Sequence, residues 1–304
     1  MNITKKKNRN KNKNFTIKNC GPRVSGKTIH KNSCLTKELI FDLKNEYNKK
    51  YPNNLIEANN PKKIWNELNK KMKSCNSEDC WLIQLSKPEI KDKIYSIIFS
   101  PKKPKSWDKN PNEWLSNFDI LNVLVQYEDT FPEFEFLGPS FIDFDKTLLS
   151  KNYKCVDNDL CKFNLKDQID KKKYKIGIIF NLDEHTQDGS HWVSLFIDID
   201  NEFIFFFDSV GTKIPSEIKK LVDRIIHQGK NLKNPIYFTF YENHPMEHQF
   251  GDTECGMYSL FFIITLLTHK INSKKKSLSY LINFFKKKRI TDKQVENLRY
   301  IYYN

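Results

Sequence analysis

Alanine is nearly absent from this chain. It occurs once in 304 residues, at Ala58, whereas Lys, Asn and Ile are heavily used. This pattern indicates the codon bias of an AT-rich genome and does not restrict the fold. The sequence also lacks a signal peptide and any apolar run long enough to span a bilayer, since the longest run, Leu260 to Leu267, ends at Thr268-His269-Lys270. We therefore expect an intracellular protein in which this run forms a buried core helix.

Cysteines are few and odd in number, at positions 20, 34, 75, 80, 155, 161 and 255. An odd count without a signal peptide favours a reducing, intracellular compartment. Cys75 and Cys80, together with Cys20 and Cys34, raise the hypothesis of a zinc site. Zinc sites usually show two short-spaced ligand pairs, and no second pair is visible in this part of the sequence. We therefore expect free thiols and no metal.

Acidic residues are too few to balance the basic ones. The chain has 51 Lys and Arg against 37 Asp and Glu, a formal net charge of +14. A solvated basic surface with a tail would explain this balance, and so would contact with nucleic acid. Residues 1–14 form a basic, Asn-rich tail that we expect to be disordered. The aromatic content of 13% and the long apolar runs predict that the rest is globular.

Helical spacing of apolar residues characterises the N-terminal third. Residues 36–50 predict a helix with Thr36 as its cap, and residues 61–72 predict a second helix that begins with proline. Residues 100–111 contain three prolines, many charges and little apolar content, which is typical of a linker. We therefore expect a mainly helical N-terminal arm over residues 15–105 and a larger domain over residues 106–304.

The larger domain alternates strand-like and helix-like segments. The strand-like runs are rich in Val, Ile and Phe, which predicts a sheet buried on both faces, and they cover residues 175–181, 191–198, 202–208 and 235–241. Asp200-Asn201 predicts a tight turn that joins two of them in a hairpin. Helices are expected over residues 112–130, 216–227, 255–269, 278–288 and 291–302. The fold class is therefore α+β, with a mixed or antiparallel sheet packed by helices.

Cys255 lies at the predicted start of the apolar helix and is followed by Gly256. A thiol attacks a carbonyl as thiolate, and a helix N-terminus or an adjacent imidazolium lowers its pKa. Gly256 removes bulk where a substrate backbone would approach. Taken alone, Cys255 could equally be a small buried hydrophobic residue. Its possible partners elsewhere in the chain favour a nucleophile.

Those partners are His191, Asp208 and Gln249. His191 and Asp208 are 17 residues apart, at the two open ends of the predicted hairpin, so they could face each other, with Asp208 orienting the imidazole. Gln249 precedes Cys255 by six residues and could donate to an oxyanion, together with the backbone N–H of Cys255. The alternatives are a strand-edge histidine, a turn aspartate and a surface glutamine. We interpret His185, His244 and His248 as loop residues without a role.

This arrangement resembles the Ulp1-like superfamily of cysteine proteases. His191-Trp192, Asp208 and Gln249-x5-Cys255-Gly256 match its order and spacing. The segment from Thr253 to Phe261 is most similar to the polyprotein-processing proteases of large cytoplasmic DNA viruses, of the African swine fever virus type. Ser33-Cys34-Leu35 and Ile290-Thr291-Asp292 also resemble that branch, so the likeness covers about residues 111 to 304 and, more loosely, the arm.

The resemblance implies a thiol endopeptidase that cleaves after Gly-Gly in viral structural precursors, in the virion and the host cytoplasm. Trp192 and Trp114 would roof a tunnel too narrow for side chains, whereas Trp114 alone could be plain core packing. Asn117 stands where SUMO proteases carry an aspartate that helps to hold the SUMO tail. No cofactor is implied, although the related adenovirus protease uses DNA. We expect the arm to aid binding of substrate or partner and the chain to have no membrane contact.

Three other functions compete with this one. A SUMO- or ubiquitin-like deconjugating protease would use the same residues. A nucleic-acid-binding protein without catalysis would explain the tail and Lys286-Lys287-Lys288-Arg289, but not the Cys, His, Asp and Gln pattern. Residues 21–28 match a phosphate-binding loop, and residues 204–208 could pass for its magnesium-binding strand. Pro22 removes a donor N–H, and no buried strand precedes the loop or helical pattern follows it, which argues against this function.

Overall fold

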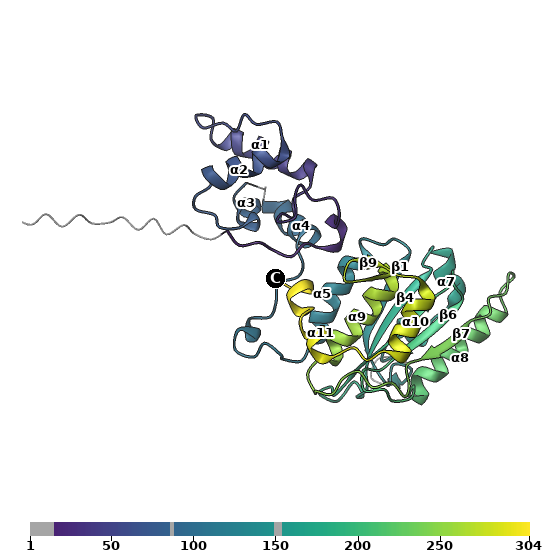
Figure 1. Cartoon of the computed structure of the whole chain (residues 1–304). Helices are drawn as coiled ribbons and strands as arrows, with labels where there is room; N and C mark the ends of the chain where they lie inside the picture. The colour runs from purple at the N-terminus through teal and green to yellow at the C-terminus, as the bar shows by residue number, and fades with distance from the viewer. Residues whose placement is uncertain (1–14, 86–87, 149–153) are drawn as a thin grey trace, which may run out of the picture. The chain divides into compact units, whose positions relative to one another are not determined.

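The chain folds into two compact units, one ending at Ser100 and the other beginning at Pro101. The computed structural model in Figure 1 describes residues 15–85, 88–148 and 154–304. The predicted tail, residues 1–14, lies outside the described residues. The division between the units falls at the first proline of the segment that was interpreted as a linker. Below, residues 1–100 are called the N-terminal unit and residues 101–304 the C-terminal unit.

The N-terminal unit is helical. After a short 3-10 turn, η1 (Pro22–Val24), come α1 (Lys37–Lys50), α2 (Pro61–Lys71), α3 (Glu78–Leu85) and α4 (Pro88–Ile98). The Thr36 side chain accepts a hydrogen bond from Leu39 N and caps α1, and Asn60 caps α2 just before Pro61. Residues from α1, α2 and α3 share one apolar core, which includes Ile40, Leu43, Ile64, Leu68 and Trp81. The two helices predicted from periodicity are confirmed.

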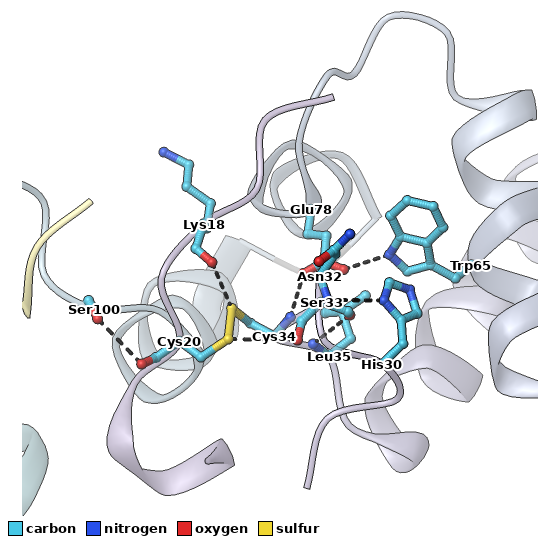
Figure 2. Close-up of a disulfide and its surroundings, with 10 residues drawn as sticks. All are labelled: Lys18, Cys20, His30, Asn32, Ser33, Cys34, Leu35, Trp65, Glu78 and Ser100. Atoms are coloured by element: carbon cyan, nitrogen blue, oxygen red, sulfur yellow. Dashed lines mark hydrogen bonds between the residues drawn. A yellow bond between two sulfur atoms is a disulfide. The ribbon is translucent and has the colours of Figure 1, made fainter. Parts of the chain in front are cut away.

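The expectation of free thiols is wrong for Cys20, Cys34, Cys75 and Cys80, and Cys155 and Cys161 are paired as well. They form three disulfides, whose Cα atoms are 5.1, 5.4 and 6.3 Å apart: Cys20–Cys34, Cys75–Cys80 and Cys155–Cys161. Figure 2 shows the first of them, where Cys34 N donates to the carboxylate of buried Glu78 at 2.8 Å. Sequence spacing could not reveal these pairs, because loop closure determines which Cα atoms come within bonding range. Cys255 is the one cysteine left free.

The segment that matches a phosphate-binding loop has a different structure. Pro22–Val24 is a 3-10 turn, and Thr28 pairs with Thr36 in an isolated β-bridge. The first α-helix begins only at Lys37, nine residues after Thr28. A phosphate-binding loop requires a helix N-terminus at its Lys-Thr end, where backbone N–H groups converge on the anion. The local structure therefore does not support nucleotide binding at this segment.

A five-stranded mixed sheet forms the centre of the C-terminal unit. Its strands are β1 (Phe134–Phe141), β4 (Lys175–Asn181), β5 (Trp192–Asp198), β6 (Phe203–Phe207) and β7 (Thr239–Glu242), in the order β1-β4-β5-β6-β7. The outer pairs β1/β4 and β6/β7 are parallel, and the inner pairs are antiparallel. Two short hairpins flank the sheet: β2 (Thr147–Leu148) with β3 (Lys154–Cys155), and β8 (Lys270–Ile271) with β9 (Lys274–Lys275). The predicted α+β class and the hairpin at Asp200-Asn201 are confirmed.

Helices cover both faces of this sheet (Figure 1). Phe203, Phe205 and Phe207 of β6 pack in the cluster that contains α9 (Cys255–Thr268), α5 (Asn117–Glu128) and α10 (Leu278–Lys287). Ile204 and Phe206 pack on the other side, with α8 (Ser216–Lys230) and α7 (Leu165–Asp170). The remaining short helices are η2 (Lys105–Asp108), α6 (Asn158–Cys161), α11 (Asp292–Glu296) and α12 (Arg299–Tyr302). Burial on nearly every side explains why α9 is apolar all round, as expected of a core helix.

Several boundaries differ from the sequence prediction for local reasons. β1 was missed because Gly138 and Pro139 interrupt its apolar pattern. α5 begins at Asn117 and not at 112, because Ser116 and Asp119 form a capping box. Trp114 therefore precedes the helix, where its side chain is 46% exposed. Across the described part of the chain, no helix combines the length and apolarity that crossing a membrane requires.

Candidate active site

The predicted histidine and aspartate lie at the ends of two neighbouring inner strands of the sheet. His191 immediately precedes β5, and Asp208 immediately follows β6. These strands are antiparallel, with Ser194 opposite Phe207, so the start of one lies beside the end of the other. His191 Nε2 and Asp208 Oδ1 are 2.7 Å apart and form a hydrogen bond. The hairpin therefore brings the two residues together, and they are called the His191–Asp208 dyad below.

Cys255 is the first residue of α9 and is 2% exposed. Its side chain interacts with that of His191 and helps to raise the pKa of the imidazole. Because Asp208 occupies Nε2 of the imidazole, Nδ1 is the nitrogen that remains for the sulfur. The helix N-terminus contributes a partial positive charge at the same point. The fold thus gathers a carboxylate, an imidazole and a thiol at one place, which is the combination that nucleophilic catalysis uses.

Asp208 is fully buried and surrounded by donors. Val210 N and Thr212 N donate to its two oxygens at 3.1 and 3.2 Å, and the Thr212 hydroxyl also donates. Burial alone would raise the pKa of Asp208, but the hydrogen bond and charge of His191, with the donors from Thr212 and Val210, lower it overall. The carboxylate therefore stays ionised, and it can hold the imidazole in one orientation.

The pKa of His191 is raised to about 9. Burial lowers this pKa, but hydrogen bonds and charges from Asp208 and Cys255 outweigh burial. A raised folded-state pKa contributes stability that is fully present below the unfolded value of about 6.5 and is lost as pH rises through about 9. We expect this group to remove on the order of 2–3 kcal/mol of unfolding free energy across that range.

Urea unfolding between pH 6 and 10 would measure this loss, with His191→Gln as the control that cannot titrate in this range. The wild-type protein should lose more stability than the variant as pH rises. Equal pH dependence of the two proteins would contradict the raised pKa.

Gln249 lies in the loop between β7 and α9 and is 3% exposed. Ser209, the residue after Asp208, donates its hydroxyl to Gln249 Oε1 at 2.7 Å, and its carbonyl accepts Gln249 N at 2.8 Å. Gln249 Nε2 donates to Gly251 O at 2.7 Å, which leaves the second N–H of the amide for another acceptor. The loop that carries Gln249 is thus fixed to the same strand end as the dyad.

Replacing Gln249 by alanine should lower kcat about a hundredfold, because one oxyanion donor typically contributes two to three orders of magnitude. KM should change little, since the bond strengthens only as charge develops on the carbonyl oxygen. Steady-state kinetics on a peptide substrate measures both constants, and Ser209→Ala tests whether positioning matters as well. A Gln249→Ala variant with wild-type kcat would remove this residue from the mechanism.

His248 has a structural role that the sequence did not indicate. It is fully buried; its Nε2 contacts Phe285 O at 2.9 Å, and its Nδ1 accepts Ile290 N at 3.1 Å. Burial lowers the pKa of His248 to about 4, despite the hydrogen bond to Phe285 O, so the ring stays neutral near pH 7. Its interpretation as a loop residue without a role is therefore incomplete, because its hydrogen bonds fix the backbone directly before Gln249.

A buried ion pair lies directly behind the nucleophile. The carboxylate of Glu254, the residue before Cys255, accepts hydrogen bonds from Arg299 Nε at 3.0 Å and from Arg299 Nη2 at 3.1 Å. The side chains of Arg299 and Glu254 are 3% and 5% exposed, and the guanidinium lies 4.6 Å from the ring centre of Trp107. Neither partner was singled out from the sequence for this contact. The pair ties the start of α9 to α12 and fixes where Cys255 begins its helix.

A cleft of about 620 Å³ is lined by Trp114 and Trp192, the latter directly after His191 in the sequence. None of Cys255, His191, Asp208 and Gln249 lines this cleft. Trp192 Nε1 donates to Leu115 O at 3.0 Å, which joins β5 to the segment before α5. A Cβ on Gly256 would lie 3.0 Å from Leu115 Cβ, so this glycine allows the cleft wall to pack on α9. The glycine was expected to make room for substrate; in the structure, a neighbouring leucine fills that space.

Asn243 was missed, although it supports the dyad. It is 1% exposed, its Oδ1 accepts Asp208 N at 2.9 Å, and its Nδ2 donates to Asp208 O at 2.7 Å. An isolated asparagine after a strand gives no sequence signal of such a contact. No cluster of three or more His, Cys, Asp or Glu side chains suitable for a metal occurs in residues 15–85, 88–148 and 154–304.

The chain also matches a known protein family. The Ulp1 protease family, C-terminal catalytic domain, matches residues 128–303, more than half of the chain. The chain belongs to the Ulp1 protease family. The matched range contains the Cys255, His191 and Asp208 cluster, and the predicted enzyme class, a cysteine endopeptidase, is confirmed at the level of the family.

Related proteins of this family come from large DNA viruses. R355 of Acanthamoeba polyphaga mimivirus, whose name assigns it provisionally to the thiol proteases, is 32% identical over 181 residues, 59% of this chain and 55% of that protein. The chain therefore spans about half the length of this relative. The "SUMO-1 cysteine protease S273R" of African swine fever virus (isolate Warthog/Namibia) is 26% identical over 227 residues, 66% of this chain and 78% of its own.

The crystal structure of the African swine fever virus pS273R protease has the same fold. It superimposes with a TM-score of 0.61 at 19% sequence identity, and it covers 95% of this chain and 97% of that one. The likeness extends over both units, so the helical N-terminal unit belongs to the shared fold. The predicted resemblance to the African swine fever virus type is confirmed.

Proposed function

We propose that this Ulp1-family chain is a thiol endopeptidase that cleaves after Gly-Gly in viral structural precursor proteins, in the virion and at assembly sites in the host cytoplasm. Cys255 is the nucleophile, His191 the general base and acid, Asp208 its orienting partner and Gln249 the oxyanion donor. The observation that carries the proposal is the hydrogen bond between Asp208 and His191, together with the interaction of His191 with Cys255 at a helix N-terminus.

In the proposed reaction, the Cys255 thiol gives its proton to His191 Nδ1, and the sulfur attacks the carbonyl carbon of the second glycine. The oxygen becomes an oxyanion that accepts from the second N–H of Gln249 Nε2 and from the backbone N–H of Cys255. The C–N bond then breaks as the imidazolium protonates the leaving amine. Water, deprotonated by His191, hydrolyses the resulting thioester, and the carboxylate product leaves. A pKa of His191 near 9 favours the imidazolium, which is the form that protonates the leaving amine.

Selectivity for glycine is supported by the two tryptophans of the cleft. Trp192 follows His191 and is held by Leu115 O, and Trp114 precedes Leu115 and lines the same cleft. If their rings confine the substrate close to the dyad, only residues without side chains fit beneath them. The proposed preference for Gly-Gly is therefore steric.

The test is a set of peptides that vary around a Gly-Gly pair, incubated with the intact protein and with Cys255→Ala as the blank. Cleavage after Gly-Gly, with loss when either glycine becomes alanine, supports the proposal. Cleavage that tolerates alanine at both positions would refute the glycine selectivity but would leave the proposed thiol protease activity standing. No cleavage of any peptide or folded precursor would refute the activity itself.

A deconjugating activity on SUMO- or ubiquitin-like proteins is the second candidate, because several of the African swine fever virus relatives are named SUMO-1 cysteine proteases. Asn117 lines the cleft at the position where SUMO proteases use an aspartate, which weakens contact with a SUMO tail. Hydrolysis of a SUMO fusion at a rate comparable to that of the best Gly-Gly peptide would favour this second function. An Asn117→Asp variant should then act faster on the fusion than the wild type.

We further propose that the N-terminal unit binds a polyanion such as nucleic acid. Residues 1–100 contain 22 Lys and Arg and 9 Asp and Glu, a formal charge of +13, whereas residues 101–304 contain 29 and 28, a charge of +1. Almost the whole positive charge of the chain thus belongs to the smaller unit. Counterion release should make such binding strongly dependent on salt.

Replacing Lys5, Lys6 and Lys7 by glutamine should weaken DNA binding and reduce the slope of log K against log salt by about two to three. Fluorescence anisotropy with duplex DNA at several salt concentrations measures the slope. The matched control replaces Lys274, Lys275 and Lys276 of the C-terminal unit. Equal slopes for the two variants would contradict a role of the N-terminal charge. Peptide cleavage with and without DNA would show whether the polyanion also activates the enzyme.

A further inference from the structure

Both peptide units of Gln249 are held by one ion pair near the C-terminus. On the N-terminal side, the carbonyl of His248 accepts a hydrogen bond from Arg289 Nε at 3.1 Å. On the C-terminal side, the backbone N–H of Phe250 donates to the two oxygens of the Asp292 carboxylate, at 3.3 and 3.2 Å. Arg289 and Asp292 contact each other at 3.5 Å. The backbone on either side of Gln249 is therefore attached to the same pair of charges.

Asp292 also contacts the helix that carries the nucleophile. Tyr258 follows Cys255 by three residues in α9 and is fully buried, and its hydroxyl lies 3.1 Å from Asp292 Oδ1. The two proposed oxyanion donors come from separate segments: the Gln249 amide from the loop and the backbone N–H of Cys255 from α9. Their spacing depends on contacts that join the loop to the helix, and the Asp292 carboxylate makes one such contact to each.

The place of Asp292 at the start of α11 does not explain these contacts. The cap of this short helix is a capping box formed by Thr291 and Gln294. An acidic residue in the first turn usually acts on the helix through its charge alone. Such a role requires no hydrogen bond to a loop 42 positions away in the sequence, as the one from Phe250 N is. The carboxylate is thus directed at the oxyanion loop.

We propose that Asp292 is a positioning residue for the oxyanion donor Gln249. The inference rests on the proposed function, in which the second N–H of Gln249 Nε2 binds the oxyanion. Such a donor is effective only at about 2.7–3.1 Å from the oxygen in the transition state, and a misplacement of about 1 Å can lower the rate a hundredfold. By holding Phe250 N and the Tyr258 hydroxyl at one carboxylate, Asp292 keeps the loop at a fixed distance from α9.

A double-mutant cycle between Asp292 and Gln249, measured on a Gly-Gly peptide, tests the proposal. Asp292→Ala should lower kcat about tenfold and change KM less than about twofold, because the affected bond strengthens only in the transition state. In a Gln249→Ala background, the same substitution should lower kcat by no more than about twofold, since the donor that it positions is already absent. Asp292→Asn, which keeps one oxygen as an acceptor, should retain most of kcat.

The matched control is Glu296→Ala, which removes a carboxylate from the same helix, where Glu296 pairs with Lys293. It should keep the wild-type kcat. Thermal unfolding shows whether Asp292→Ala is folded. If it is not, Tyr258→Phe, which removes only the hydroxyl beside Asp292, takes its place in the cycle, and its loss of kcat should likewise disappear in the Gln249→Ala background.

A folded Asp292→Ala variant with undiminished kcat would overturn the inference while Gly-Gly cleavage still stands. A loss of equal size with and without the Gln249 side chain would overturn it too, because the carboxylate would then support the fold and not the donor. If the wild-type protein cleaves no Gly-Gly peptide, the proposed function fails first, and this inference fails with it. The two failures are distinguishable because they appear in different proteins.

Discussion

Replacing Cys255 by alanine should abolish cleavage of a Gly-Gly peptide, with a fall in kcat/KM of at least about ten-thousandfold. The reason is that the acyl-enzyme cannot form without the sulfur, and neither His191 nor Asp208 can substitute for it. His191→Ala should have a nearly equal effect, and the double variant should be no worse than either single one, because the residues act as a unit. Initial rates measured with a fluorogenic peptide provide the comparison.

The fold should survive the Cys255→Ala change, because the substitution removes one buried atom at the end of a helix and costs only about 1 kcal/mol. Thermal unfolding of the variant therefore serves as the control for the kinetic result. A folded Cys255→Ala variant with undiminished activity would end the assignment of the nucleophile. A folded variant without activity, together with an active Ser259→Ala variant in the same helix, would support it.

Replacing Arg299 by methionine should destabilise the C-terminal unit by about 3–5 kcal/mol, because it leaves the buried carboxylate of Glu254 without its partner. Burial already raises the pKa of Glu254, and Arg299 opposes that rise. Since Cys255 is buried, its alkylation in a brief pulse at increasing urea concentrations reports unfolding of this unit specifically.

The double variant Glu254→Gln/Arg299→Met should recover much of the lost stability, because no buried charge then remains unpaired. Lys219→Met, which breaks the exposed pair with Asp223, is the control and should cost less than about 1 kcal/mol. If Arg299→Met unfolds at the same urea concentration as Lys219→Met, the pair has no structural importance. Slower alkylation of native Cys255 in Arg299→Met would show in addition that the pair positions the nucleophile.

Residues close in sequence or linked by a hairpin were predictable; residues joined only by the tertiary fold were not. The spacing of His191 and Asp208 could be interpreted because one tight turn relates them. Periodicity with a cap or a proline located α1 and α2, and a continuous apolar run located α9. By contrast, Arg299 reaches Glu254 across 45 positions. No local pattern encodes that contact, because it depends on how α12 packs beside the start of α9.

The same distinction explains why some predictions from the sequence were wrong. Trp114 looked like one position of a helical apolar stripe, but the capping box at Ser116 starts α5 three residues after it. The cysteines were expected to be unpaired because an odd count without a signal peptide indicated a reducing compartment, and nothing in the sequence states which loops close on each other. The net charge could be counted from the sequence, but assigning it to the two units required the domain boundary.

The disulfide pairing allows the concentration of enzyme with an intact nucleophile to be measured by thiol titration. With six cysteines bonded to each other, a preparation kept free of reductant presents a single sulfhydryl per polypeptide, that of Cys255. Stoichiometric titration with a chromogenic thiol reagent in denaturant would then give the concentration of intact nucleophile directly. Turnover numbers could be normalised to it without an active-site inhibitor, and any oxidised fraction would appear as a shortfall from one equivalent.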